Sequence, residues 1–213
     1  TCDVRYGSSV VGFQDGWRGL LEDRRIQLKN DDRNDRLLAK GGTMLGTARV
    51  NPEKLRAGLN QIKQTLEDNG IDVLIPIGGE GTLTAAHWLS EENVPVVGVP
   101  KTIDNDIVGS DLTFGFLSAV DIATQAIDRV TTTAASHHRV MVVEVMGRNA
   151  GWIALYAGVA SGSDVILIPE IPFHLDAVAR AVKERIRIGR RHTIVCVAEG
   201  ARVGPPTSGN SRG

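Results

Sequence analysis

The sequence lacks any long uninterrupted apolar run. None approaches the ~20 residues that a membrane-spanning helix requires, and the chain does not open with the charged and then apolar segments of a secretory signal. We therefore expect a cytoplasmic protein. Cysteine is scarce as well: Cys2 and Cys196 lie far apart and show neither zinc-ligand spacing nor a disulfide framework. We interpret both as reduced thiols, with Cys196 in the core.

The chain also lacks an excess of charge of either sign. Its 24 Lys and Arg side chains nearly cancel its 25 Asp and Glu side chains, which argues against a surface built for a nucleic acid or an anionic membrane. The five histidines contain no paired-ligand motif, and only His137 and His138 are neighbours, which argues against a histidine metal site. Any anion site must therefore be local.

Hydrophobic residues make up 42% of the 213 residues, enough to bury a core. Short apolar segments rich in β-branched residues alternate with segments of helical period, which predicts an α/β fold with mostly parallel sheets covered on both faces. Asn51 and Pro52 mark the start of one helix and Gly70 its end. The other predicted helices cover residues 83–90, 119–130 and 175–188, and the predicted strands cover 71–77, 94–99, 140–145, 165–168 and 193–198.

Charged side chains follow several of these strands directly. In open parallel sheets, ligands bind beyond the carboxyl ends of the strands. One such residue is usually only a turn residue, but several of suitable chemistry at one sheet edge indicate a binding site. The residues in question are Glu80, Asp104, Asp106, Arg148 and Glu199.

A glycine-rich turn, Gly78-Gly79-Glu80-Gly81-Thr82, joins a predicted strand to a helix. Its backbone amides can approach phosphate oxygens closely, although a tight turn without a ligand gives the same pattern. Because Glu80 would repel a phosphate, a bridging cation such as Mg²⁺ is the simplest interpretation. This segment predicts a site for a metal-bound nucleotide.

The segment Lys101-Thr102-Ile103-Asp104-Asn105-Asp106 places two carboxylates and a lysine directly after a strand. Phosphoryl transfer to an alcohol needs a carboxylate that accepts the hydroxyl proton and cations that neutralise the charge on the phosphate. A solvated turn built by Asp and Asn is the alternative.

These two segments, together with Met146-Gly147-Arg148, resemble the signature set of the phosphofructokinase family. Further segments resemble the family in the same order, and the resemblance covers residues 6–201. They are Gly41-Gly42-Thr43 with Arg49, Ser136-His137-His138-Arg139, Pro169-Glu170 and Glu199-Gly200. The resemblance implies a phosphotransferase that moves the γ-phosphate of ATP to the 1-hydroxyl of fructose 6-phosphate, a glycolytic step, commonly as an allosteric homotetramer.

The resemblance also implies a role for each matching residue. Asp104 would be the base, Thr102 would lie beside the transferred phosphate, and Asp106 and Glu80 would help to place magnesium, with Glu80 as the metal ligand. Arg49 and the turn of Gly78, Gly79, Glu80, Gly81 and Thr82 would bind the nucleotide. Arg139 would reach the sugar phosphate of a neighbouring subunit. The remaining sugar-binding residues would be Met146, Gly147, Arg148 and Glu199, beside Thr102, Asp104 and Asp106, with Arg148 also catalytic.

Two positions bear on the phosphate donor. Gly81 points to ATP, because pyrophosphate-using members usually carry an aspartate at that position. Lys101 points the other way, because a lysine there is typical of pyrophosphate-using members. Because a missing side chain admits a larger ligand, we favour ATP over pyrophosphate. Glu80 replaces the aspartate that is common in the family.

The resemblance implies two α/β/α lobes of Rossmann type with the site in the cleft between them, and a helix over Trp152–Ala160. We assign residues 1–115 to a partial nucleotide lobe, 116–201 to a partial sugar-phosphate lobe and 202–213 to a disordered tail. Family members normally have a Gly-Gly-Asp-x-x-Gly-x-Asn loop before the first matching segment and a Gln-Arg-Gly-Gly segment downstream, and neither is present. We therefore expect a fragment, incomplete at both ends, with little kinase activity by itself.

Three other interpretations stay open. A non-catalytic subunit of the same fold would keep these residues without activity. A lipid or NAD kinase shares the glycine motif but lacks the Pro100–Asp106 segment. A plain dinucleotide-binding domain would need a Gly-x-Gly-x-x-Gly motif between a strand and a helix, which this chain does not have.

Overall fold

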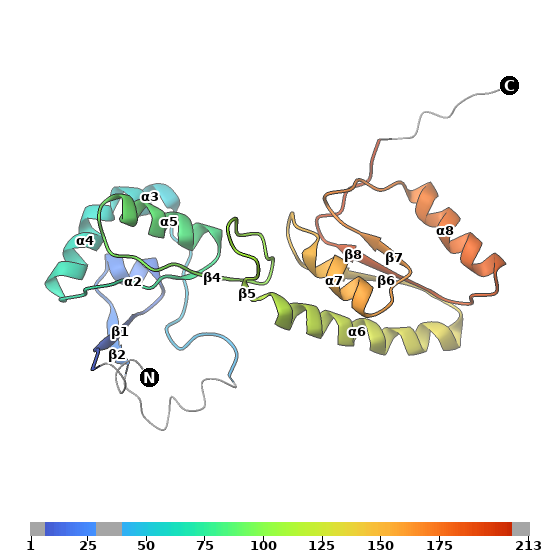
Figure 1. The fold of residues 1–213 in the computed structure, drawn as a ribbon, viewed down its shortest axis with the longest axis horizontal. Helices are drawn as coiled ribbons and strands as arrows, with labels where there is room; N and C mark the ends of the chain where they lie inside the picture. The colour runs from blue at the N-terminus through green and yellow to red at the C-terminus, as the bar shows by residue number, and fades with distance from the viewer. Residues whose placement is uncertain (1–6, 29–39, 206–213) are drawn as a thin grey trace. The chain divides into compact units, whose positions relative to one another are not determined.

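The computed structural model describes residues 7–28 and 40–205 and divides the chain into two compact units (Figure 1). The first unit is Thr1–Ile77 with Gly81–Val99, and the second is Gly78–Glu80 with Pro100–Gly213. Cys2 and residues 206–213 of the predicted tail lie outside the described residues. Just before them, Phe173 N–H donates to Arg202 O (3.0 Å) and Gly204 N–H donates to Phe173 O (2.7 Å). The predicted lobe boundary at residue 115 stays a prediction.

The first unit opens with an antiparallel pair of strands, β1 (Val10–Phe13) and β2 (Arg25–Leu28), joined through the short helix α2 (Trp17–Leu21). The chain between β1 and α2 turns through positive φ at Asp15 and Gly16. Gly19 of α2 lies so close to Gln14 that a Cβ at that position would come within 2.0 Å of the Gln14 carbonyl oxygen. The helix can therefore fold back onto β1 only with glycine there.

The predicted helix from Pro52 to Gly70 is two helices in the structure. Asn51 caps α3 (Pro52–Ala57) as predicted, since its Oδ1 accepts from Glu53 N–H at 2.8 Å. Gly58 ends α3 with ψ near 5°, and α4 (Leu59–Asp68) begins at the next residue. Glycine has little preference for the helix interior and makes a break there inexpensive, so the prediction of one continuous helix was wrong.

The core of the first unit joins α2, α3, α4 and α5 (Glu80–Glu91). Leu55, Ile62 and Leu66, which the helical spacing of the sequence places on one face, are buried there, as the 3.6-residue period requires. The buried residues are Leu20, Leu55, Ile62, Leu66, Leu74, Ala85 and Leu89.

The central sheet has the strand order β3-β4-β5, formed by β3 (Ile77–Gly78), β4 (Val99–Thr102) and β5 (Phe114–Gly115). Sequence predicted longer strands at 71–77 and 94–99, but upstream of β3 and β4 the pairing is reduced to a parallel bridge between Leu74 and Val96. Pro76 and Pro95 have no amide hydrogen to donate, which limits the regular ladder. Both still accept, from Val99 N–H and Leu74 N–H respectively at 2.9 Å.

The second unit contains a parallel sheet of order β6-β8-β7 with three helices. Its strands pair in register, from Val140 opposite Thr193 to Val145 opposite Ala198, as predicted for an α/β fold. The elements are α6 (Phe116–His137), β6 (Val140–Val145), α7 (Trp152–Ala160), β7 (Val165–Leu167), α8 (Leu175–Arg187) and β8 (Thr193–Ala198).

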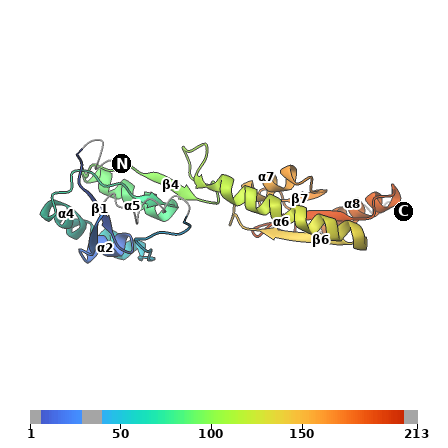
Figure 2. The same cartoon turned by 90° about the horizontal axis from the view of Figure 1, so that it is seen from below.

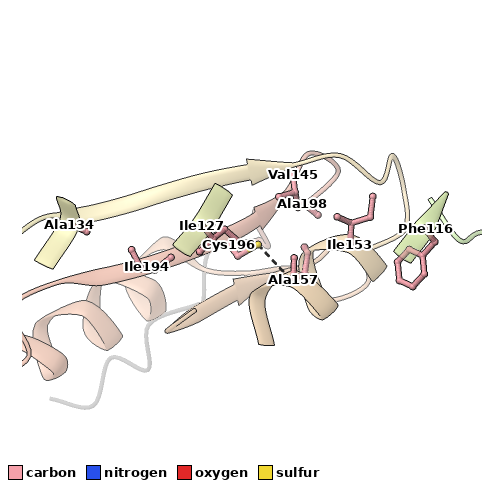
Figure 3. Close-up of a cluster of buried hydrophobic side chains, with 10 residues drawn as sticks. Phe116, Ile127, Ala134, Val145, Ile153, Ala157, Ile194, Cys196 and Ala198 are labelled. Carbon is pink, nitrogen blue, oxygen red and sulfur yellow. Dashed lines mark hydrogen bonds between the residues drawn. The ribbon is translucent and has the colours of Figure 1, made fainter. Parts of the chain in front are cut away.

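Helices α6 and α7 pack against each other and against one face of this sheet (Figures 1 and 2). Ile194 and Cys196 of β8 point into the core on that face, together with Ile127 of α6 and Ile153 of α7 (Figure 3). The Cys196 thiol is buried and free, as predicted, and burial raises its pKa to about 11. Thr193, which alternates to the opposite face, accepts from Arg185 Nε of α8 at 3.3 Å.

Both units carry exposed apolar side chains on their strands. Ile77 is 60% exposed in the central sheet, and Val142 is 65% exposed on β6, an edge strand.

In the part of the chain that the structure describes, no helix combines the length and the apolar character needed to cross a bilayer.

Candidate functional site

The segment after β4 brings a buried carboxylate to the carboxyl end of the central sheet. Asp104 is 8% exposed, whereas Asp106, two residues later, is exposed. Asp104 N–H donates to Thr102 Oγ1 at 3.2 Å, which fixes the turn that leaves the strand. Burial of an ionised carboxylate costs free energy unless a charged or hydrogen-bonding partner compensates for the lost hydration.

A second turn, after β6, carries Arg148. Gly147 and Arg148 both have positive φ (139° and 54°), a conformation that a non-glycine residue adopts only when its surroundings hold it. Here Glu199 holds it, because its Oε1 accepts from Arg148 N–H at 2.7 Å and from Gly147 N–H at 3.3 Å. Since Val145 and Ala198 are paired on neighbouring strands, the residues that follow them meet at the same sheet edge.

The electrostatics of Asp104 show which groups surround it. Burial raises its pKa above the ordinary value, and the neighbouring Asp106 carboxylate raises it further. The Arg148 guanidinium and the hydrogen bond with Thr102 lower the pKa, and Glu199 raises it. Thr102, Asp104, Asp106, Arg148 and Glu199 therefore form one electrostatic cluster within the second unit.

The glycine-rich turn runs from the end of β3 into α5. Gly79 lies beside β4, where a Cβ would come within 3.9 Å of Lys101 O and of Thr102 Cβ. Glu80 is exposed at the first residue of α5. Gly81 is exposed too, and among the described residues no atom from another segment lies within 4 Å of the place that its Cβ would occupy. Thr82 follows it in the first helical turn, where unpaired backbone amides favour an anion.

Two of the predicted site residues, Arg139 and Arg49, are not part of the Asp104 cluster within the second unit. Arg139 immediately precedes β6 and is exposed, whereas Met146, 59% exposed, immediately follows it. The intervening strand is about 20 Å long, so Arg139 lies at the opposite end of the sheet from Arg148. Arg49 belongs to the first unit, where it lines a cavity of about 470 Å³ together with Arg18 and Lys54.

Three residues near the cluster received no role in the sequence prediction, although Glu170 and Asn105 lie in segments that resemble the family. Glu170 Oε1 accepts from Gly151 N–H at 2.8 Å at the start of α7 and so steadies the far end of the Arg148 turn. Asn105 and Thr113 bond to each other across the loop between β4 and β5. An asparagine between two aspartates is a signal for a left-handed residue, and it could have pointed to Asn105.

The sequence profile of the phosphofructokinase family matches residues 1–211. The chain belongs to the phosphofructokinase family. Among its relatives, a protein named ATP-dependent 6-phosphofructokinase from Mycobacterium leprae is 73% identical over 96% of this chain. A protein of Amycolatopsis methanolica named pyrophosphate–fructose 6-phosphate 1-phosphotransferase is 53% identical over 92% of the chain. The phosphofructokinase chain spans 60% of the length of the first of these relatives and 57% of the second.

A crystal structure of Pichia pastoris phosphofructokinase in the T-state matches the chain with a TM-score of 0.84 and 36% identity. The match covers 95% of this chain and 24% of that one. The family and the α/β phosphofructokinase fold with parallel sheets are thus confirmed as predicted.

Proposed function

We propose that the protein to which this chain belongs transfers the γ-phosphate of ATP to the 1-hydroxyl of fructose 6-phosphate, giving fructose 1,6-bisphosphate. The observation that carries the proposal is the buried carboxylate of Asp104 beside Arg148 and Glu199, at the carboxyl ends of parallel strands. Relatives at 58% to 73% identity are named ATP-dependent 6-phosphofructokinase, which supports this activity.

Asp104 acts as the base in this proposal. It accepts the proton of the sugar 1-hydroxyl as that oxygen attacks the γ-phosphorus, and the leaving group is ADP. A carboxyl with a raised pKa accepts a proton more readily than an exposed one, and Arg148 keeps it ionised between turnovers. Thr102, which lies against the Asp104 amide, is placed to contact the transferred phosphate.

The sugar would be held by the turn after β6 and by Glu199. Only one carboxylate oxygen of Glu199 is used by the Gly147 and Arg148 amides, so Oε2 can accept from a sugar hydroxyl. Met146 is exposed and supplies an apolar contact, and Arg148 supplies a positive charge. Arg139, at the far end of β6, is assigned to the sugar phosphate of a neighbouring subunit in a homotetramer.

The nucleotide phosphates are assigned to Arg49 and to the turn from Gly78 to Thr82. Mg²⁺ is usually held by one or two carboxylates together with phosphate oxygens and water, so the exposed carboxylates of Glu80 and Asp106 fit it. Among the described residues no cluster of three or more His, Cys, Asp or Glu side chains is placed to hold a metal ion. When bound, the ion neutralises charge on the phosphates. A glycolytic role places the protein in the cytoplasm.

Pyrophosphate is the alternative donor, favoured by Lys101 and by the name of the Amycolatopsis relative. The space around Gly81 favours ATP. The deciding experiment measures phosphorylation of fructose 6-phosphate by the full-length product of the gene, with ATP and separately with pyrophosphate. Turnover with ATP alone is expected. Turnover with pyrophosphate alone would show that pyrophosphate, and not ATP, is the donor. No turnover with either would favour the interpretation as a non-catalytic subunit.

A further inference from the structure

The loop between β4 and β5 carries at its start two of the three acidic residues of the Asp104 cluster, Asp104 and Asp106. Its outer part is open to water, since Val108 is fully exposed at 100%. Its base is fixed by the strands, because Thr102 pairs with Gly115. An exposed loop of this kind is normally mobile, yet Asp104 within it is buried. Ile103 packs against the core of the second unit, and hydrogen bonds inside the loop add a second restraint on its first residues.

Asn105 is one part of that restraint. It lies between the two aspartates with φ of 55°, in the left-handed region. Its Oδ1 accepts from Thr113 N–H at 2.9 Å, and its Nδ2 donates to Asp111 O at 3.4 Å. The side chain thus ties the start of the loop to its end, and the left-handed conformation turns the chain between buried Asp104 and exposed Asp106.

Thr113 is the other part. It is 4% exposed, and its hydroxyl donates to Thr102 O at 2.7 Å. Thr102 in turn accepts from Asp104 N–H through its own hydroxyl. A chain of hydrogen bonds therefore runs from Thr113 through Thr102 to the backbone of Asp104. Such a chain inside a partly buried loop restricts the residues that it joins.

We propose that Asn105 and Thr113 are positioning residues for phosphoryl transfer, which hold the Thr102–Asp106 segment so that Asp104 meets the attacking hydroxyl. The proposal rests on the proposed function. A general base must lie within hydrogen-bond distance of the proton that it removes, and a displacement of about 1 Å can cost about 100-fold in rate. Neither residue needs to touch substrate for this role.

The test compares steady-state kinetics of variants of the full-length enzyme. Thr113→Val removes the hydroxyl at nearly constant shape, and Asn105→Gly keeps access to positive φ while it removes the side-chain bonds. We expect kcat to fall by about 10- to 100-fold in each, with KM for fructose 6-phosphate within about threefold of wild type. Thr113→Ser, which restores the donor, should recover most of kcat.

Ser110→Ala is the matched control, because Ser110 donates to Leu112 O in the same loop at 3.1 Å but makes no hydrogen bond with Thr102, Asn105 or Thr113. It should leave kcat unchanged. Wild-type kcat in both Thr113→Val and Asn105→Gly would overturn the proposal, as would an effect confined to KM. Loss of the cooperative thermal transition in either variant would also overturn it, since the residue would then be needed for folding.

Hydrogen exchange separates failure of this proposal from failure of the proposed function. In the 213-residue chain, the Asp104 amide should exchange at least about tenfold faster in Thr113→Val than in wild type, and at the wild-type rate in Ser110→Ala. If wild type proves inactive on fructose 6-phosphate, the proposed function fails, and this measurement still decides whether the loop is held. An unchanged exchange rate in Thr113→Val would overturn the restraint itself.

Discussion

Asp104 is a buried carboxylate whose neighbours pull its pKa in opposite directions. Replacing it with asparagine keeps its shape and removes the proton acceptor. In the full-length enzyme we expect Asp104→Asn to lower kcat by about 10³-fold or more, with KM for fructose 6-phosphate changed only a few fold. Steady-state kinetics with ATP measure both. Turnover close to wild type would remove Asp104 from the role of base.

The same residue should cost stability. Because burial raises the pKa of Asp104 in the folded chain, the unfolded chain loses its proton at a lower pH than the folded one. The folded state is therefore penalised progressively as pH rises from the ordinary pKa of 3.8 to the raised value, and the penalty persists above it. Asp104→Asn removes the penalty, so we expect it to unfold at higher urea than wild type at neutral pH.

That advantage should shrink as the pH falls below the ordinary pKa, where wild-type Asp104 is protonated in both states. Urea unfolding of the 213-residue chain at several pH values measures it. Asp128→Asn, an exposed carboxylate on α6, is the control and should not differ from wild type at any pH. A less stable Asp104→Asn at neutral pH would mean that the favourable contacts with Arg148 and Thr102 outweigh burial.

Gly81 is the residue that bears on the donor. A Cβ there would have open space on the side of the other described segments, so Gly81→Asp should fold, while its charge would lie where the α-phosphate of ATP is expected. Repulsion of roughly 1.4 kcal/mol corresponds to about a tenfold higher KM for ATP, which steady-state kinetics measure. Gly81→Ala, which adds bulk without charge, should change this KM little. An equal effect of both substitutions would point to space rather than charge.

In the second unit, an ion pair and a hydrogen bond through Asp164 join α8 to β8 at the end of the sheet opposite Asp104. Arg185 of α8 pairs with Asp164 at 2.7 Å, and Asp164 Oδ2 accepts from Ile194 N–H of β8 at 2.8 Å. Asp164→Ala removes the charged partner of a largely buried guanidinium, which keeps only its neutral acceptors Thr193 Oγ1 and His192 O, and it also removes the acceptor of the Ile194 amide. We therefore expect a loss of about 2 kcal/mol in the free energy of unfolding, measured in urea. Glu184→Ala removes the fully exposed pair with Arg187 and should change nothing measurable.

At this scale the sequence predicted most elements and missed their interruptions. The run from Val140 to Val145 and the one from Thr193 to Ala198 are strands to the residue, because β-branched residues favour the extended conformation of a strand. Periodicity carries no information about a break, so Gly58 and the prolines of the central sheet shortened elements that the pattern predicted as continuous. The hydrogen bonds of Asn105, Thr113 and Glu170 join residues 6 to 19 positions apart in loops, which hydrophobic periodicity does not predict. The local signal among them is the asparagine between two aspartates.

For the whole molecule, ordered motifs along the chain predicted the family and fold, which the comparisons confirm. The motifs could be found because each combines glycines or charges that a packed core would not select, whereas the packing between elements depends on shape. The structure brings together Asp104, Arg148 and Glu199 from segments after three different strands. The assignment of these and the other site residues to substrate contacts stays a prediction for the kinetic tests above.

The apolar surface of the strands should govern how the chain behaves in solution. Val142 is 65% exposed and Val140 45% exposed on β6, which lies at the edge of its sheet, and an apolar edge strand is a template for pairing with another chain. We expect the 213-residue chain to self-associate as its concentration rises, as measured by light scattering after gel filtration. Val142→Lys should shift the chain toward monomer, because a lysine on the edge opposes pairing, whereas Val203→Lys, at an equally exposed position (61%) outside the edge strand, should not. Equal effects of both would trace association to net charge instead of to the β6 edge.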